Sequence, residues 1–155
     1  MTAETSPGIS VLLPVSGAAP HLAAAVDSIL SQTRGDLELL LVDDGADEAA
    51  RKRVETYSDP RIRMVRHDHP IGAGPTLAEA VGLARGAYFA LMPADGAADP
   101  ERLARQVAFL EAHPDFQLDP FPHPLTGSAT DGTLLIWPQD ADSDAMFIAR
   151  MVRGA

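Results

Sequence analysis

Three aspartates follow apolar segments at positions where a nucleotide or a metal ion could be bound. Asp43 and Asp44 come directly after the apolar run Leu37–Val42, and Asp95 follows the run Tyr88–Met92. An apolar run, a helix-periodic stretch and a second apolar run are typical of a βαβ unit, which binds nucleotides beyond the carboxyl ends of its strands. A carboxylate placed there can accept a hydrogen bond from a base N–H or hold a divalent cation.

Each aspartate also has a purely structural interpretation. Asp43 and Asp44 can cap the helix that follows them and accept hydrogen bonds from loop N–H groups. Asp95 precedes Gly96 and can serve as an ordinary turn residue. Both interpretations remain open from the sequence.

Two further groups of residues carry possible chemistry. His67 and His69 bracket Asp68, and a His-x-His pair is compatible with a metal site, although no third ligand is evident. Gly72 and Gly74 form a glycine-containing loop before a predicted helix, where backbone N–H groups can face a phosphate.

The composition indicates a folded domain and restricts its partners. The chain has 155 residues, with 46% hydrophobic and 22% charged, as in an ordinary globular domain. A formal net charge of −10 argues against nucleic acid and anionic membrane surfaces as partners. Without cysteine, the chain has no disulfide and no thiolate nucleophile. No signal-peptide pattern or membrane-spanning apolar run is evident, so we expect a cytoplasmic protein without membrane insertion.

Alternating segments predict a three-layer α/β/α Rossmann-like sandwich. Apolar runs of strand length occur at Ile9–Val15, Leu37–Val42, Ile62–Val65 and Tyr88–Met92. Helix-periodic segments lie between them, at 22–30, 46–57 and 75–84, and a fourth begins at Asp99-Pro100-Glu101. Gly86 is expected to end the third helix as a left-handed cap. Strands alternating with helices give a parallel sheet with right-handed crossovers.

The first part of the chain, about residues 8–116, resembles the family 2 glycosyltransferases of the GT-A type. The resemblance rests on Ile9–Val15 and on Leu37–Asp44, which ends in the two aspartates and glycine typical of that family. It implies a parallel strand order of 3-2-1-4, a nucleotide diphosphate sugar as the bound partner, and Mg²⁺ or Mn²⁺ as the cofactor.

The resemblance also implies roles for individual residues. Pro14 and Val15 match the strand end whose backbone lies against the base. Asp44 matches the aspartate that contacts the base, and Asp43 matches its usual neighbour. Gly72 stands in the third loop, where its backbone could approach the nucleotide.

The family's metal motif and its other nucleotide contacts are altered. Asp95 matches the second, metal-binding aspartate of the Asp-x-Asp motif, whereas Pro93 replaces the first. Ser16 and Gly17 stand where the family has tyrosine and asparagine, and Thr76-Leu77-Ala78 replaces an Ala-Arg-Asn run. One carboxylate, together with diphosphate oxygens and water, can still hold Mg²⁺.

Residues 117–155 change in character. Three prolines mark a loop, and two apolar runs, Leu134–Trp137 and Met146–Val152, predict an antiparallel hairpin beside the fourth strand. The stretch Phe109–Arg150 resembles the C-terminus of Sun/Nop2-type RNA cytosine-5 methyltransferases, but it carries no catalytic cysteine. We expect residues 1–155 to form a single domain.

These observations predict a nucleotide-sugar-binding glycosyltransferase family 2-like domain. It would transfer a sugar from a nucleotide diphosphate donor if an acceptor domain is supplied elsewhere, because complete enzymes of the family carry an acceptor pocket and a base that this chain does not match. The alternative is a non-catalytic, engineered or hybrid α/β module with a vestigial site, since three nucleotide-contacting features are replaced. RNA methylation is disfavoured by the absent cysteine and the acidic charge.

Overall fold

The computed structural model describes residues 6–113 and 148–150, which form one five-stranded sheet. Its order is β3-β2-β1-β4-β5, with β1 (Ile9–Gly17), β2 (Leu37–Ala46), β3 (Ile62–Arg66) and β4 (Tyr88–Leu91) parallel. The predicted order 3-2-1-4 is confirmed. β5 (Ile148–Arg150) is antiparallel to β4, where the hairpin was expected, and the other arm of that hairpin lies outside the described residues.

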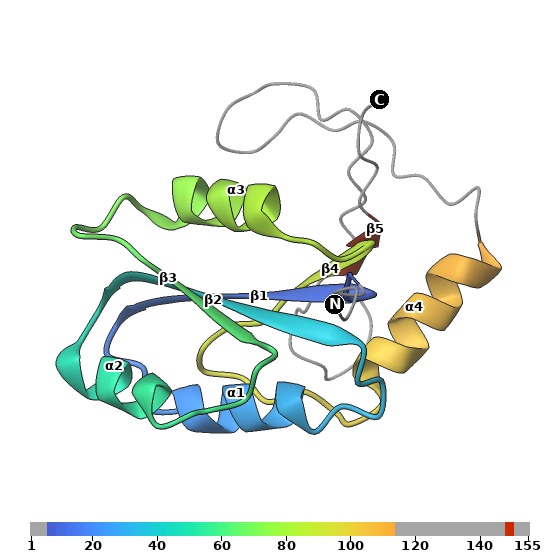
Figure 1. Cartoon of the computed structure of the whole chain (residues 1–155), viewed down its shortest axis with the longest axis horizontal. Helices are drawn as coiled ribbons and strands as arrows, with labels where there is room; N and C mark the ends of the chain where they lie inside the picture. The colour runs from blue at the N-terminus through green and yellow to red at the C-terminus, as the bar shows by residue number, and fades with distance from the viewer. Residues whose placement is uncertain (1–5, 114–147, 151–155) are drawn as a thin grey trace, which may run out of the picture.

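Helices cover both faces of the sheet and make three layers (Figure 1). α1 (Leu22–Leu30), α2 (Glu48–Glu55) and α4 (Arg102–Ala112) lie on one side, and α3 (Ala73–Leu83) lies on the other. Right-handed crossovers explain this, since the chain moves from β1 to β3 in one direction and returns to β4 in the other. No helix in the described part of the chain is both long and apolar enough to cross a membrane.

The core lies around β1 and β2, the two central strands that the sequence marks as continuous apolar runs. Ile9, Leu12 and Leu13 of β1 and Leu39 and Leu40 of β2 are fully buried. Burying a side chain of this size contributes about 1.5–3 kcal/mol to stability. The same strands carry the candidate site at their carboxyl ends, so a rigid core positions it.

A buried polar cluster joins the sheet to the end of α3 at the opposite edge. Glu38 accepts hydrogen bonds from the Ser10 hydroxyl, the Arg85 N–H (2.7 Å) and Arg63 Nη1 (2.6 Å). Burial raises the pKa of Glu38, but the hydrogen bonds from Ser10, Arg63 and Arg85 outweigh it and lower the pKa overall. Glu38 is therefore a paired structural carboxylate.

Gly86 does not cap α3 as the sequence led us to expect. The helix ends at Leu83, and Gly86 does not have a positive φ. Instead, a Cβ atom at Gly86 would lie 2.6 Å from the Ser10 amide nitrogen and 2.7 Å from the Ile9 carbonyl carbon. Glycine is needed because two backbone segments approach closely, not because the backbone is left-handed.

Candidate functional site

Most of the predicted site residues lie at the carboxyl edge of the sheet. Pro14 pairs with Val42 and Val15 with Asp43, so the ends of β1 and β2 are adjacent, and Asp44 is the next residue of β2. On the other side of β1, the strand β4 ends at Leu91. Asp95 follows in an exposed turn. Asp44 and the end of β4, from which the chain continues to Asp95, thus lie on the two sides of β1.

Asp43 is buried, and its carboxylate accepts hydrogen bonds from nearby backbone N–H groups and from an arginine of α2. Its Oδ1 accepts the Ala46 N–H at 2.7 Å and the Gly45 N–H at 3.1 Å, and its Oδ2 lies 2.7 Å from Arg51 Nε on α2. Burial raises the pKa of Asp43, but the bonds from Arg51 and the loop N–H groups lower it overall. The predicted structural role of Asp43 as an acceptor for loop N–H groups fits these contacts, but the cap of α2 is Asp47, whose side chain accepts the Ala50 N–H at 2.7 Å.

Asp44 is also nearly buried, and it binds the loop that precedes α3. Its Oδ1 accepts the Ile71 N–H at 2.7 Å and lies 2.9 Å from His67 Nδ1, while its Oδ2 accepts the Gly72 N–H at 2.9 Å. The bonds from Ile71 and His67 are the main reason that the pKa of Asp44 falls to about 2. Asp44 is therefore ionised throughout the physiological range.

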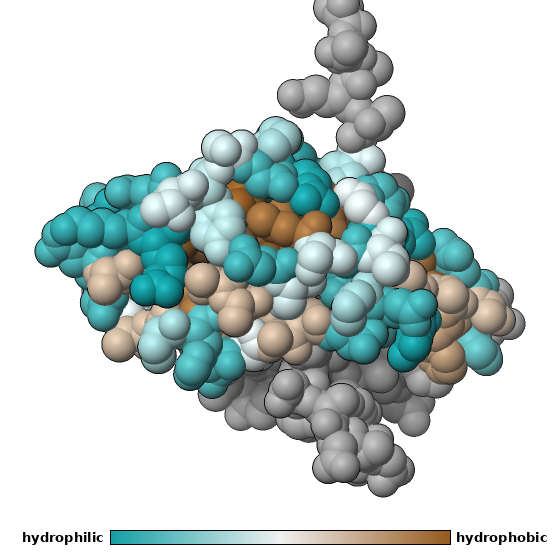
Figure 2. Space-filling model, turned by 90° about the horizontal axis from the view of Figure 1, so that it is seen from below, coloured by the Kyte–Doolittle hydropathy of each residue, from teal (hydrophilic) through white to brown (hydrophobic). Residues whose placement is uncertain are grey.

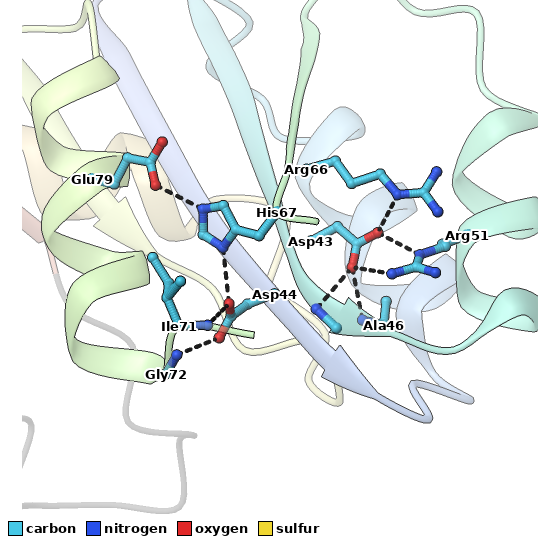
Figure 3. Close-up of polar contacts among 10 residues, drawn as sticks. Asp43, Asp44, Ala46, Arg51, Arg66, His67, Ile71, Gly72 and Glu79 are labelled. Carbon is cyan, nitrogen blue, oxygen red and sulfur yellow. Dashed lines mark hydrogen bonds and ion pairs between the residues drawn. The ribbon is translucent and has the colours of Figure 1, made fainter. Parts of the chain in front are cut away.

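The two aspartates face opposite sides of the sheet (Figure 3). Successive residues of a strand point to opposite faces, so Asp43 meets α2 and Asp44 meets the start of α3. They cannot act together as one chelating pair. Of the two, Asp44 is the one beside the loop that contains Gly72 and the N-terminus of α3.

Gly72 and the residues before it pack down on the end of β2. Gly72 is the N-cap of α3 with φ 97°, a conformation that favours glycine, and its N–H points at Asp44. Gly45 has φ 89°, and a Cβ atom there would lie 2.6 Å from the Pro70 ring. The Gly72 amide, a candidate for phosphate contact from the sequence, is thus directed at a carboxylate in this structure.

His67 connects Asp44 to α3. Its Nδ1 faces Asp44, and its Nε2 lies 2.7 Å from Glu79 Oε2. Sequence reasoning paired His67 with His69 as possible metal ligands and passed over Glu79. The sequence could have placed His67 near Asp44, because His67 directly follows β3 and β3 is the parallel neighbour of β2. Within residues 6–113 and 148–150, no group of three or more His, Cys, Asp or Glu could hold a metal ion.

Val15 faces the layer of α1 and α2 instead of the side of Asp44. It lines a small apolar cavity of about 10 Å³, together with Leu41, Asp43, Val54 and Met64 among others. Figure 2 looks at the side of α1 and α2, where hydrophobic residues are visible between hydrophilic ones. The cavity of about 10 Å³ beside Val15 could hold about one water molecule but not a nucleotide. Any base contact from Val15 therefore has to come from its backbone, as the family role requires.

Asp95 supplies one carboxylate for a possible metal ion. It is exposed, and its turn is closed by a hydrogen bond from the Gly96 N–H to the Pro93 carbonyl at 3.4 Å. Hard cations such as Mg²⁺ prefer oxygen ligands and often keep several waters. The chemistry of Asp95 fits such an ion only if diphosphate oxygens and water complete the coordination.

Solved structures with the same fold bind nucleotide sugars. A mannosyltransferase from Pyrobaculum calidifontis, PcManGT, solved with GDP-Man and Mn²⁺, aligns with a TM-score of 0.59 and 25% identity over 69% of this chain and 33% of its own. The S. aureus protein TarS (residues 1–349), solved with UDP-GlcNAc, aligns with a TM-score of 0.62 and 21% identity over 68% of this chain and 31% of its own. The second likeness concerns the fold alone.

Curated relatives are longer glycosyltransferases. The putative glycosyltransferase EpsE of Bacillus subtilis is 32% identical over 119 residues, which are 74% of this chain and 42% of that protein. The Escherichia coli glucosyltransferase WfgD, named for UDP-Glc and a diphosphoundecaprenol-linked acceptor, is 28% identical over 66% of this chain and 40% of its own. The chain thus spans less than half the length of these two relatives.

The family match also bears on the C-terminal part of the chain. The family model of glycosyl transferase family 2 matches residues 10–140 and so includes Leu134–Trp137. The resemblance of residues 109–150 to Sun/Nop2-type methyltransferases finds no support in these comparisons. By the extent of this match and by its relatives, the chain belongs to glycosyl transferase family 2.

Proposed function

We propose that this chain is the nucleotide-sugar-binding part of a family 2 glycosyltransferase and that it binds a nucleotide diphosphate sugar at the carboxyl edge of its sheet. The observation that carries the proposal is that Asp44 and the end of β4, which leads into the turn of Asp95, lie on either side of β1. The family match supports the same edge. Sugar transfer requires an acceptor-binding part, which would be supplied from elsewhere.

In this proposal the residues at the carboxyl edge make different contacts with the nucleotide sugar. Asp44 accepts a hydrogen bond from a ring N–H of the base, which uracil and guanine carry and adenine lacks. The backbone of Pro14 and Val15 forms the floor, and Asp95 holds a divalent cation together with diphosphate oxygens. Such a cation stabilises the charge of the departing diphosphate when an acceptor hydroxyl attacks the anomeric carbon.

Calorimetric titration of the whole chain with UDP, GDP and ADP, each with and without Mn²⁺, tests the proposal. We expect metal-dependent binding of UDP or GDP and much weaker binding of ADP. Asp95→Ala should remove the metal dependence, whereas Asp36→Ala, which alters an exposed aspartate beside the opposite end of β2, should not. Absence of binding at millimolar nucleotide would rule the proposal out.

A second candidate function is a folded module with a vestigial site. One observation favours it: both oxygens of Asp44 already accept hydrogen bonds from the loop before α3. If the chain binds no nucleotide but Asp44→Asn still lowers its melting temperature, Asp44 has a structural role only.

A further inference from the structure

His67 stands between two carboxylates from different elements. Its Nδ1 lies 2.9 Å from Asp44 Oδ1 on β2, and its Nε2 lies 2.7 Å from Glu79 Oε2 on α3 (Figure 3). The His67 side chain is 11% exposed, Asp44 is 7% exposed and Glu79 is 39% exposed. The ring is therefore enclosed at the Asp44 end and reachable by water at the Glu79 end.

The number of protons on His67 follows from its two partners. An ionised carboxylate only accepts hydrogen bonds, so each ring nitrogen that faces one must carry a proton. A neutral ring has only one N–H. The lone pair of its other nitrogen would then point at a lone pair of a carboxylate oxygen, which is repulsive. With both carboxylates ionised, the doubly protonated imidazolium satisfies both contacts. In keeping with this, Asp44 first and Glu79 second raise the pKa of His67.

Other charged groups near His67 are directed elsewhere. Arg66 precedes it on β3, but its side chain lies on the opposite face of the sheet, 3.6 Å from Asp43 Oδ2. In the described part of the chain, the ion pairs of His67 are made with Asp44 of β2 and Glu79 of α3. These two carboxylates set its protonation.

Both carboxylate oxygens of Asp44 are held by groups of the protein. Its Oδ1 meets both His67 and the Ile71 N–H, whereas its Oδ2 meets the Gly72 N–H. A carboxylate oxygen can accept two hydrogen bonds, and the buried Thr76 side chain also lowers the pKa of Asp44, so a base N–H that binds Oδ2 takes the position next to Thr76. That position is useful only while the carboxylate is prevented from rotating, and His67 fixes Oδ1.

We propose that His67, anchored by Glu79, is a positioning residue that orients the Asp44 carboxylate toward the base of the bound nucleotide. The inference rests on the proposed function, because it assigns the residue that prepares the same base site. Holding an acceptor in its bound orientation lowers the ordering cost of binding. A positive ring beside Asp44 also reduces the repulsion between this acidic protein and an anionic nucleotide.

Binding of UDP with Mn²⁺, measured by calorimetry between pH 5.5 and 9, tests the inference. We expect the affinity of the unaltered chain to fall roughly threefold to tenfold as the pH rises through the pKa of His67, because the neutral ring loses one of its two contacts. Glu79→Gln should abolish this fall, since a glutamine amide can donate to the neutral Nε2. The nucleotide's own titration is common to both proteins and cancels in the comparison.

Variants of His67 complete the test. His67→Ala should weaken binding about tenfold at neutral pH by removing a charge-assisted hydrogen bond. His67→Asn can place an amide N–H near the position of Nδ1, so it should bind more tightly than His67→Ala and show no pH dependence from this position. A ring titration followed by NMR, with His67→Asn identifying the signal among five histidines, should show a lower His67 pKa in Glu79→Gln.

The possible failures are distinguishable. If the unaltered chain binds no UDP or GDP, the proposed function fails and the positioning role falls with it. If it binds nucleotide, but its pH profile matches that of Glu79→Gln or its affinity matches that of His67→Ala, only the inference about His67 is wrong. Should His67→Ala fail to fold, His67→Asn and Glu79→Gln still decide the outcome.

Discussion

Asp43 and Asp44 are consecutive residues whose carboxylates bind different layers of the molecule. Asp43 Oδ2 lies 2.7 Å from Arg51 Nε of α2, and Asp44 Oδ1 lies 2.9 Å from His67 Nδ1 on the side of α3. Because the sheet separates them, each can be altered without removing the contacts of the other.

Asp43→Asn should lower stability and leave nucleotide affinity nearly unchanged. Asp43 is 2% exposed and its charge is matched by Arg51, so loss of that charge-assisted pair should lower the free energy of unfolding by about 1–3 kcal/mol. Urea unfolding and UDP titration of the same samples check both parts. A marked loss of affinity in a folded Asp43→Asn protein would show that the two faces are coupled.

The stabilising contribution of Asp44 should disappear in acid. The pKa of Asp44 is lowered to about 2 in the folded protein, against about 3.9 in an unfolded chain. A lowered folded-state pKa means that the contribution is complete above about pH 4 and is lost as the pH falls toward 2. The difference in Tm between the unaltered chain and Asp44→Asn should therefore shrink as the pH falls below 4. Above about pH 6 the difference also reflects His67, because Asp44 raises the pKa of His67. A difference that persists at pH 2 would contradict this.

Arg63→Met should destabilise the chain more than Arg34→Met. Arg63 pairs with Glu38, whose side chain is 6% exposed, so its removal leaves a buried charge without its cation. Since Arg63 itself is partly exposed, we expect a loss of about 2 kcal/mol. Arg34 pairs with the exposed Asp36, and its replacement should change stability by less than about 1 kcal/mol. Equal values in denaturant unfolding would mean that Glu38 tolerates its burial without Arg63.

Gly86→Ala should be strongly destabilising, whereas Gly82→Ala should be neutral or stabilising. A Cβ atom at Gly86 meets backbone atoms of Ser10 and Ile9 that cannot move aside, so a loss of about 2 kcal/mol or more is expected. Gly82 lies in α3, where an added Cβ atom would meet nothing within 4 Å, and alanine there favours the helix by up to about 1 kcal/mol. Thermal unfolding of the two variants compares them directly.

Pro93→Asp should strengthen metal-dependent nucleotide binding several-fold. Proline stands where the family has the first aspartate of its metal motif, and a second carboxylate adds an oxygen ligand near Asp95. Titration with UDP at fixed Mn²⁺ measures the effect, and the same titration in EDTA is the control. If the gain survives removal of the metal, it has another cause.

Sequence reasoning succeeded where the signal is local and repetitive. Apolar runs of strand length located β1 and β2, and the family resemblance gave the strand order that the structure confirms. Parallel strands bring Asp44 and the end of β4, which precedes Asp95, to one edge of the sheet. The assigned ligand contacts of these residues remain predictions.

The contacts that complete the site depend on three-dimensional proximity and were missed. Glu79 reaches His67 only because α3 packs on β1 and β2, and no spacing along the chain encodes that meeting. Gly86 was misinterpreted because close backbone approach and a left-handed cap both call for glycine, and sequence does not distinguish them. Ile71 contributes a backbone N–H, which carries no residue-type signal, and the Gly72 N–H, which was expected to face a phosphate, binds Asp44 instead.

Few residues of α3 are buried against the sheet, and this affects the local dynamics of the site. Of its eleven residues only Thr76 and Ala80 are buried, whereas α1 buries four of its nine. Regions with few buried contacts open locally at lower free energy than the core. The amide protons of Ile71 and Gly72 should therefore exchange with solvent well before those of Leu12 and Leu40, which would give Asp44 a route to transient release without unfolding of the sheet.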